Sequence, residues 1–500
     1  GFFPTLFYVI FPAYGLLPML ALGAMVFCLP FLTPWFLRRL GVRGWLFFSA
    51  GGVIILRLAE QVTWDSRWDL ALTAAGTSLL VIFFPAYLSF QRTRRARPSG
   101  SVALGMLLGV AFDTALRGIT LTLDLSWQPG LLPLATVAVI ALLAVLALIE
   151  EGRMPEVEPS ADLPWSVALT LTGLGPFLML EMVIFQNLGE LAQRAGWALP
   201  WAWLVVAGGN VLALLAAALI VAYPQRAFRK TTILLNLCLF FPLLFYSNRL
   251  APAVVPLGHA VAAFDLALIL TTLLTHPAGE GWPTRLMLAG AAALGLFFVL
   301  LGGYYGRFNL EPLLPLAGLL LWLAAILAAF SRSPEERRSP FPLWAPAGLA
   351  IVLLILPLMQ GFTWQPPQPA GPLPEQTLRV MSFNIHQGFD TDGFLNVEAI
   401  AQLIEANEVD AVGLQEVQRG WALDGGIDLV TWLSQRLGMP YIFAPTLGQS
   451  FGNAVLSRVP ILAHEAQRFP THPQSPFPRG YLRVTLAMAS RPVDLIVTHL

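Results

Sequence analysis

The sequence predicts a multi-span α-helical membrane domain of about twelve helices, followed by a smaller domain of mixed α/β structure. Of its 500 residues, 56% are hydrophobic and 12% are charged, which is too apolar for an ordinary soluble protein. Apolar runs of membrane-spanning length recur up to residue 361. A proline-rich stretch follows, and beyond it short strand patterns replace these runs. We therefore divide the chain into 1–361, a linker at 362–376, and 377–500.

The charge and cysteine content exclude some classes of protein. The formal net charge is zero, so overall electrostatics indicates no nucleic-acid partner. Cys28 and Cys238 both lie in apolar runs, and no disulfide framework is expected. The chain begins inside one apolar run and ends inside another. We therefore expect it to be a fragment of a longer protein.

The apolar runs define the expected spans, because a helix needs about 20 apolar residues to cross roughly 30 Å of hydrocarbon. Residues 1–14 are also apolar and are interpreted as the tail of an earlier span. The expected spans are 16–37, 44–62, 69–90, 101–123, 130–149, 165–188, 199–223, 231–247, 252–275, 283–303, 311–330 and 343–361.

The basic residues of the connecting loops predict the orientation. One set of alternate loops carries fifteen arginines and lysines and the other set carries four. Cytoplasmic loops carry the excess of positive charge, so the first set is predicted to be cytoplasmic. The last span then leaves the membrane on the opposite side. Residues beyond about 362 are therefore expected to be extracytoplasmic in an integral, multi-pass membrane protein.

The linker at 362–376 is rich in proline and is predicted to be stiff and extended. The segments beyond it alternate between strand and helix before a run of strands, which predicts α/β packing. Strands are expected in "TLRVMSFNI", "DAVGLQEV", "YIFAPT", "GNAVLSRVPI", "YLRVTLAMA" and "VDLIVTHL". Amphipathic helices are expected in "NVEAIAQLIEAN" and in "IDLVTWLSQRLG", which ends on Gly438.

Four polar side chains stand at the ends of these apolar strands: Asn384, Glu416, Asn453 and His499. Strand ends at one sheet edge are where α/β folds gather their sites. A carboxylate beside an amide oxygen suits Mg²⁺ or Mn²⁺, and a nearby histidine can protonate a leaving group or hydrogen-bond a phosphate oxygen. The alternative is structural, because a single glutamate at a strand end is usually a solvated cap and a single asparagine usually makes a turn.

The motifs "MSFNIHQG", "VDAVGLQEV", "GNAVLSRVPI" and "VTHL" occur in the order found in the endonuclease/exonuclease/phosphatase superfamily, which this region resembles. The resemblance covers about residues 377–500 and implies a four-layer, DNase-I-like α/β sandwich that is incomplete at its C-terminus. It implies that Asn384 and Glu416 hold a divalent metal, Mg²⁺ or Mn²⁺, and that His499 contacts the scissile phosphate or acts as an acid. It also implies that Asn453 contacts phosphate, with Arg458 and His386 as weaker substrate-binding candidates.

The combination of a polytopic region with such a domain resembles the GPI-anchor lipid-remodelling proteins of the PGAP-two-interacting type. The superfamily also needs later Asp-x-Asn and Asp-His elements, and neither is seen in this sequence, which stops at Leu500. The fragment alone is therefore expected to be inactive.

The resemblance implies a membrane-bound, metal-dependent phosphodiesterase that acts on phosphorylated lipids or glycolipids. Two alternatives remain open: a membrane-tethered extracellular nuclease, and a non-catalytic transporter or scaffold whose outer domain binds lipid phosphate. A nuclease would need a basic groove. Residues 377–500 contain eight arginines and eleven acidic residues, which predicts no cationic stripe.

Several charged residues fall within the expected spans, where charges are costly unless they are paired or hydrated. Arg57 and Glu60 lie close together, and Asp113 and Arg117 are spaced to pair on one helix face. The Asp113 pair is interpreted either as structural or as part of a polar cavity. For Glu181 and Asp265 the cavity interpretation is preferred.

Overall fold

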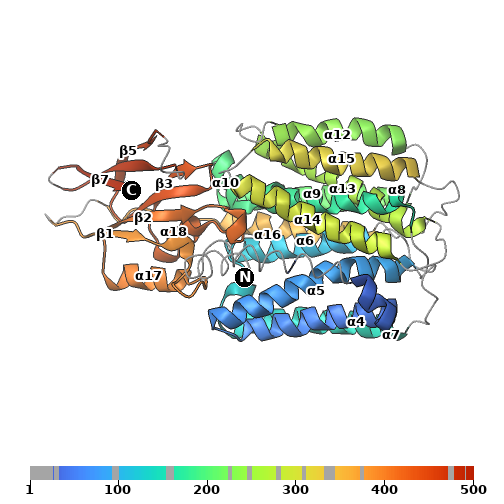
Figure 1. The fold of residues 1–500 in the computed structure, drawn as a ribbon. Helices are drawn as coiled ribbons and strands as arrows, with labels where there is room; N and C mark the ends of the chain where they lie inside the picture. The colour runs from blue at the N-terminus through green and yellow to red at the C-terminus, as the bar shows by residue number, and fades with distance from the viewer. Residues whose placement is uncertain are drawn as a thin grey trace.

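The computed structural model has a bundle of helices at one end and a sheet-containing domain at the other (Figure 1). The described helices of the bundle lie between Thr33 and Thr363, and the strands begin at Val380. The structure describes residues 26, 33–92, 101–153, 163–222, 228–244, 251–276, 283–306, 311–331, 344–371, 377–470, 478–489 and 491–499.

Nine helices in the described part of the chain are long and apolar enough to cross a membrane, and two shorter apolar helices cover Thr231–Leu244 and Val352–Thr363. Each overlaps one of the expected spans, whereas the first expected span, 16–37, lies largely outside the described residues. Eight of the nine are single helices: α4 (Thr33–Gln61), α5 (Ser66–Arg92), α6 (Ser101–Ile119), α7 (Leu131–Arg153), α11 (Leu199–Ala222), α13 (Ala251–Thr275), α14 (Thr284–Gly306) and α15 (Leu313–Ser331). The two shorter ones belong to α12 (Phe228–Leu244) and α16 (Trp344–Thr363).

One further span is built from short consecutive pieces: α8 (Trp165–Ala168), η4 (Leu169–Gly173), α9 (Leu174–Leu180) and the π-turn η5 (Glu181–Phe185). It lies deep in the bundle, with 78% of its apolar stretch buried. Gly175 explains part of this close packing, because a Cβ there would lie 2.1 Å from the carbonyl oxygen of Ala293 on α14. Helix α7 is peripheral by contrast, with 11% buried.

The C-terminal domain contains two sheets. The first has the order β1-β2-β4-β3, with β1 and β2 parallel and the other neighbours antiparallel, and the second has the antiparallel order β5-β6-β7. The elements are β1 (Val380–Asn384), α17 (Val397–Ala406), β2 (Ala411–Gln418), α18 (Leu429–Leu437), β3 (Tyr441–Leu447), β4 (Phe451–Ser457), β5 (Ile461–Arg468), β6 (Gly480–Leu486) and β7 (Val493–Thr498).

These elements form three layers. Apolar residues of α17 and α18, including Ile404 and Leu433, pack with Leu414 on one face of the first sheet. Val455 on the other face packs against Val484 of the second sheet. The described residues therefore supply three of the four layers that the resemblance predicts. The fully buried pattern of β2 reflects its central position, with helices on one side and a sheet on the other.

Strand β5 was not predicted from the sequence. We assigned "GNAVLSRVPI" to a single strand, whereas the structure ends β4 at Ser457 and starts β5 at Ile461. Every residue of β5 after Ile461 is exposed, so the strand has no buried face. Without a buried face the sequence shows no hydrophobic alternation, which is the signal that sequence analysis relies on.

The loop between β2 and α18 joins the two parts of the molecule, and it packs against α10 (Leu188–Ala195) and neighbouring helix ends. Asn187 donates from Nδ2 to the Gly420 carbonyl at 2.7 Å while its Oδ1 caps α10 at Glu190 N. A Cβ on Gly420 would lie 2.2 Å from that same nitrogen, so only glycine fits. The Tyr305 hydroxyl accepts from the Ala422 N–H at 3.0 Å. The domain is therefore docked through specific buried polar contacts.

A buried ion pair lies at the centre of this junction. Arg419 donates from Nε and Nη2 to the two carboxylate oxygens of Asp428 at 2.9 and 2.8 Å, and it also hydrogen-bonds Gln193 of α10. Burial acts to lower the pKa of Arg419, but the neighbouring Asp428 carboxylate outweighs it and the pKa is raised, so Arg419 stays charged. The Asp428 N–H donates to Thr122 Oγ1 of the helical region at 2.7 Å.

Candidate active site

The parallel pairing of β1 with β2 brings two of the predicted residues together. The register places Asn384 opposite Gln415, next to Glu416. Asn384 Nδ2 donates to Glu416 Oε1 at 3.1 Å, and Asn384 Oδ1 accepts from the His386 N–H at 3.0 Å. The expectation that polar residues at these strand ends share one edge therefore holds for this pair.

Glu416 has a backbone conformation that glutamate rarely adopts. Its φ is 55°, in the left-handed region, and the pairing of β2 with β4 shifts register between Leu414 and Val417. A β-bulge of this kind redirects a side chain next to many active sites. Left-handed backbone costs about 1–2 kcal/mol for a residue with a Cβ. Strain of this size at a polar cluster supports a functional role for Glu416.

His499 reaches the same cluster from the second sheet. It follows β7, and its Nε2 lies 3.6 Å from Glu416 Oε1, with both side chains about one-fifth exposed (22% and 19%). Arg479 Nη1 hydrogen-bonds His499 Nδ1. Because a guanidinium can only donate, Nδ1 is the acceptor and Nε2 carries the proton. His499 therefore presents an N–H towards Glu416.

Arg479 was not singled out by sequence analysis. It precedes β6, and the pairing of Tyr481 with Thr498 places the start of β6 beside the end of β7, where His499 follows. No sequence motif marks this arginine, since the contact depends on the antiparallel register of two strands. Its guanidinium adds positive charge to a cluster that would bind a phosphate.

The other predicted substrate-binding residues differ in position. Asn453 is buried, and its Nδ2 donates to the Gly480 carbonyl at 3.2 Å, so it links the first sheet to the second beside Arg479. His386 lies in the turn after β1, and its backbone N–H donates to Asn384 Oδ1. Arg458 follows the end of β4 that pairs with Ala411, and its N–H donates to the Asp410 carbonyl. The structure thus places Arg458 at the opposite end of β2 from Glu416, apart from the cluster.

The donor set at this edge fits a magnesium ion that is held by few protein ligands. Mg²⁺ in phosphate sites commonly takes one or two protein oxygens and completes its shell with water and phosphate. Glu416 and Asn384 can supply two oxygens once the Asn384 amide turns its Oδ1 from the His386 N–H towards Glu416. Across the described residues no group of three or more His, Cys, Asp or Glu side chains has an arrangement that could hold a metal.

The cluster lies close to the helical region. Gly420, which contacts Asn187, is four positions after Glu416, so the Cα atoms of Glu416 and Gly420 are at most about 14 Å apart. On the β1 side, Phe389 packs on Trp127 with ring centroids 6.2 Å apart, five residues after Asn384. The strand ends that carry the cluster thus face the ends of the helices (Figure 1).

The pKa of His499 gives a prediction about stability. Burial lowers this pKa below 6.5, the positive charge of Arg479 lowers it further, and Glu416 acts in the opposite direction. As pH falls below 6.5, the unfolded chain binds the proton before the folded chain does, so the stability that neutral His499 contributes is lost. We expect the difference in melting temperature between wild type and His499→Gln to shrink between about pH 8 and about pH 5. Equal differences in melting temperature at both pH values would contradict a lowered pKa for His499 in the folded protein.

The α/β/β layering and the Asn384–Glu416–His499 cluster are features that the resemblance to the endonuclease/exonuclease/phosphatase superfamily led us to expect. Residues 375–500 match the protein family described as "PGAP2IP, C-terminal nuclease-like domain", which confirms the sequence-based resemblance for this quarter of the chain. This chain is also similar to a solved endonuclease/exonuclease/phosphatase from Beutenbergia cavernae DSM 12333. The identity is 28% and the TM-score 0.21, over 25% of this chain and 38% of that one.

Proposed function

We propose that the protein is a membrane-bound, metal-dependent phosphodiesterase whose C-terminal domain lies outside the cytoplasm and acts on lipid or glycolipid phosphates. The observation that carries the proposal is the docking of the cluster-bearing strand ends on the ends of apolar helices. If the helices span a membrane, Glu416 lies at the level of the lipid headgroups. A phosphate attached to a lipid would then reach the site without leaving the bilayer.

The arrangement of basic residues supports the proposed orientation. Three arginines at the helix ends remote from the sheet domain donate to backbone carbonyls of other segments. Arg43 donates to Gly152, Arg92 to His276 and Arg285 to Leu163. These are arginines of the set that sequence analysis assigned to the cytoplasm. The sheet domain lies at the other end of the bundle (Figure 1), the end that the proposal assigns to the extracytoplasmic side.

Each side chain of the cluster has a chemical role in the proposed reaction. Glu416 and Asn384 would hold Mg²⁺ or Mn²⁺, which supplies positive charge to a phosphoryl oxygen when bound. His499 keeps a neutral imidazole, since its pKa is lowered, and its Nε2–H can donate to a phosphate oxygen that gains charge. Arg479 fixes this tautomer from the other side of the ring.

Substrate class and metal dependence can be tested together with the full-length protein, including any residues that follow Leu500. Purified protein would be offered phospholipids, glycolipid phosphates and DNA, with and without a chelator. We expect hydrolysis of a lipid phosphate that is lost on chelation and restored by Mg²⁺ or Mn²⁺. Faster cleavage of DNA than of any lipid would instead identify a tethered nuclease. Lipid binding without hydrolysis would identify a binding module.

A further inference from the structure

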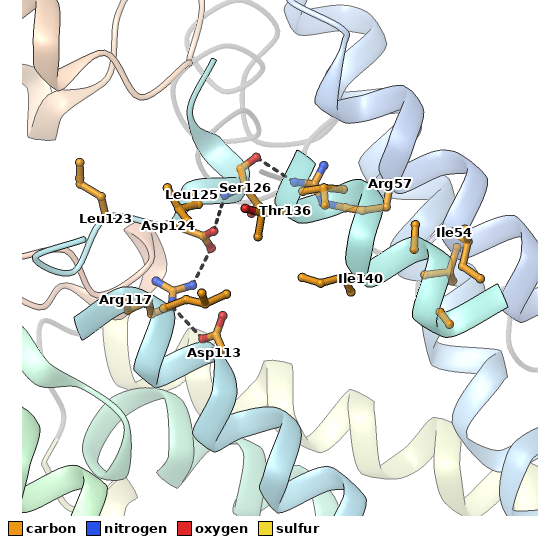
Figure 2. A pocket seen from close by; sticks show the side chains of 15 residues that line it. Ile54, Arg57, Asp113, Arg117, Leu123, Asp124, Leu125, Ser126, Thr136 and Ile140 are labelled. Atoms are coloured by element: carbon orange, nitrogen blue, oxygen red, sulfur yellow. Dashed lines mark hydrogen bonds and ion pairs between the residues drawn. The ribbon is translucent and has the colours of Figure 1, made fainter. Parts of the chain in front are cut away.

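A cavity of about 340 Å³ lies between α4, α6 and α7, outside the site described above. One side is apolar and is lined by residues such as Ile54, Leu116, Ile140 and Ala144. The other side carries charged groups from three segments: Arg57, Asp113 with Arg117, and Asp124. Figure 2 shows Arg57, Asp113 and Ile140 around the same open space. The cavity is thus amphipathic, with an apolar part and a charged part.

Arg117 is fully engaged at the charged end. It binds Asp113 through Nε at 2.8 Å, Asp124 through Nη2 at 2.6 Å, and the Gly425 carbonyl through Nη1 at 2.6 Å (Figure 2 shows the two acidic partners). The third contact ties the helical region to the C-terminal domain. This resolves the two interpretations of the Asp113–Arg117 pair, because it is both a structural contact and part of a cavity wall.

Two charged groups at this end remain accessible to a ligand. The Arg57 side chain is 30% exposed. Its Nη2 is fixed by the Ser126 carbonyl at 2.8 Å and by Gln61 at 2.9 Å, and its Nη1 lies 3.4 Å from Glu60 Oε2. The Asp113 side chain is 60% exposed. The cavity therefore offers one oriented guanidinium and one carboxylate, each able to make a charge-assisted hydrogen bond.

The surroundings of the cavity indicate where its ligand would come from. Helix α7 forms one wall and is almost entirely exposed on its outer side, with Leu143 at 60%. Phe112 on α6 is 53% exposed. The charged end lies beside the loop whose Leu123 packs into the core of the C-terminal domain, so it is at the same helix ends as that domain. In a membrane, the apolar part would face acyl chains and the charged part would face headgroups.

We infer that this cavity binds a zwitterionic phospholipid of the phosphoethanolamine type. Its phosphate pairs with Arg57, its ammonium pairs with Asp113, and an acyl chain lies along Ile54, Ile140 and Ala144. A lipid with an anionic headgroup and no amine would bring a second negative charge beside Asp113 and leave that carboxylate with Arg117 as its partner and none from the lipid. A diacylglycerol has no charged group and would add no partner to Arg57 or to Asp113. The inference goes beyond the proposed hydrolysis, because binding here needs neither a metal nor Glu416.

The test is lipid binding by the purified full-length protein in detergent, without divalent metal. Native mass spectrometry and thermal stability would be measured with phosphatidylethanolamine, phosphatidylglycerol and diacylglycerol. We expect phosphatidylethanolamine to be retained and to raise the melting temperature most. Asp113→Asn should weaken its binding by about tenfold, because a charge-assisted hydrogen bond is lost without a change of shape.

A second pair of variants tests the apolar part without touching the charged network. Ala144→Leu fills the cavity, whereas Ala147→Leu adds the same side chain on an exposed position of α7 that does not line it. We expect only Ala144→Leu to reduce lipid retention. Equal retention of the three lipids, or equal behaviour of these two variants, would show non-specific annular binding and would overturn the inference. Glu416→Gln should leave metal-free lipid binding in this cavity unchanged. The test can therefore distinguish failure of this inference from failure of the proposed hydrolase function.

Discussion

Replacing Glu416 with glutamine in the full-length protein is expected to lower the rate of phosphodiester hydrolysis on the order of 10³-fold. The substitution keeps the shape of the side chain and its position at the β2 bulge, but it removes the negative charge. The neutral amide no longer balances a divalent cation, and it no longer orients the Nε2–H of His499, which lies 3.6 Å from the carboxylate oxygen. The loss should fall mainly on kcat, because charge stabilisation is needed most in the transition state.

The matched control is Glu405→Gln, the same change on the exposed surface of α17. Glu405 pairs with Arg436 at 2.9 Å, and exposed pairs contribute little, so activity should stay near the wild-type value. Calorimetric titration with Mg²⁺ would give a readout that is independent of turnover, and Glu416→Gln should weaken metal binding. Wild-type activity and wild-type metal affinity in Glu416→Gln would reject this residue as the metal ligand.

Asp428→Ala is expected to destabilise the C-terminal domain by about 3–5 kcal/mol. The Asp428 side chain is fully buried and accepts two hydrogen bonds from Arg419. It also accepts from the Thr431 N–H at 3.2 Å and from Thr431 Oγ1 at 2.8 Å, which caps the start of α18. Truncation removes this cap and leaves a buried guanidinium without its counter-charge. Thermal melting monitored by tryptophan fluorescence would measure this loss of stability.

A double variant separates the cost of the unpaired guanidinium from the cost of the lost helix cap. Arg419→Met combined with Asp428→Leu removes both charges and fills similar volume, so it should recover much of the stability that Asp428→Ala loses. Asp494→Ala is the surface control, since Asp494 pairs with the exposed Arg483 at 2.6 Å and its loss should change melting little. A melting temperature for Asp428→Ala equal to that of wild type would show that the junction does not stabilise the domain.

The charged residues within the spans show how far local reasoning extends. Glu181 was assigned to a cavity, and it does line one of about 470 Å³ between helices and the 422–426 loop, where its Oε2 accepts from Gln186 at 2.9 Å. Its other oxygen lies 3.0 Å from His259 Nε2, a partner that no sequence spacing indicated. Asp265 has a different environment, since it is fully buried and accepts from Asn236 at 3.2 Å. The cavity interpretation is therefore confirmed for Glu181, and for Asp265 the structure shows full burial with Asn236 as its hydrogen-bond donor.

The sequence alone determined which segments are apolar helices and all of the strands except β5, and it placed Asn384 and Glu416 at strand ends. These properties follow from hydrophobic periodicity, which each segment carries in its own residues. Only the tertiary structure revealed Arg479 beside His499, the separation of Arg458 from the cluster, and the contacts of Asn187 and Arg419 across the junction. Such contacts join residues far apart in the chain. Strand register and packing between domains decide them, and neither leaves a pattern in the local sequence.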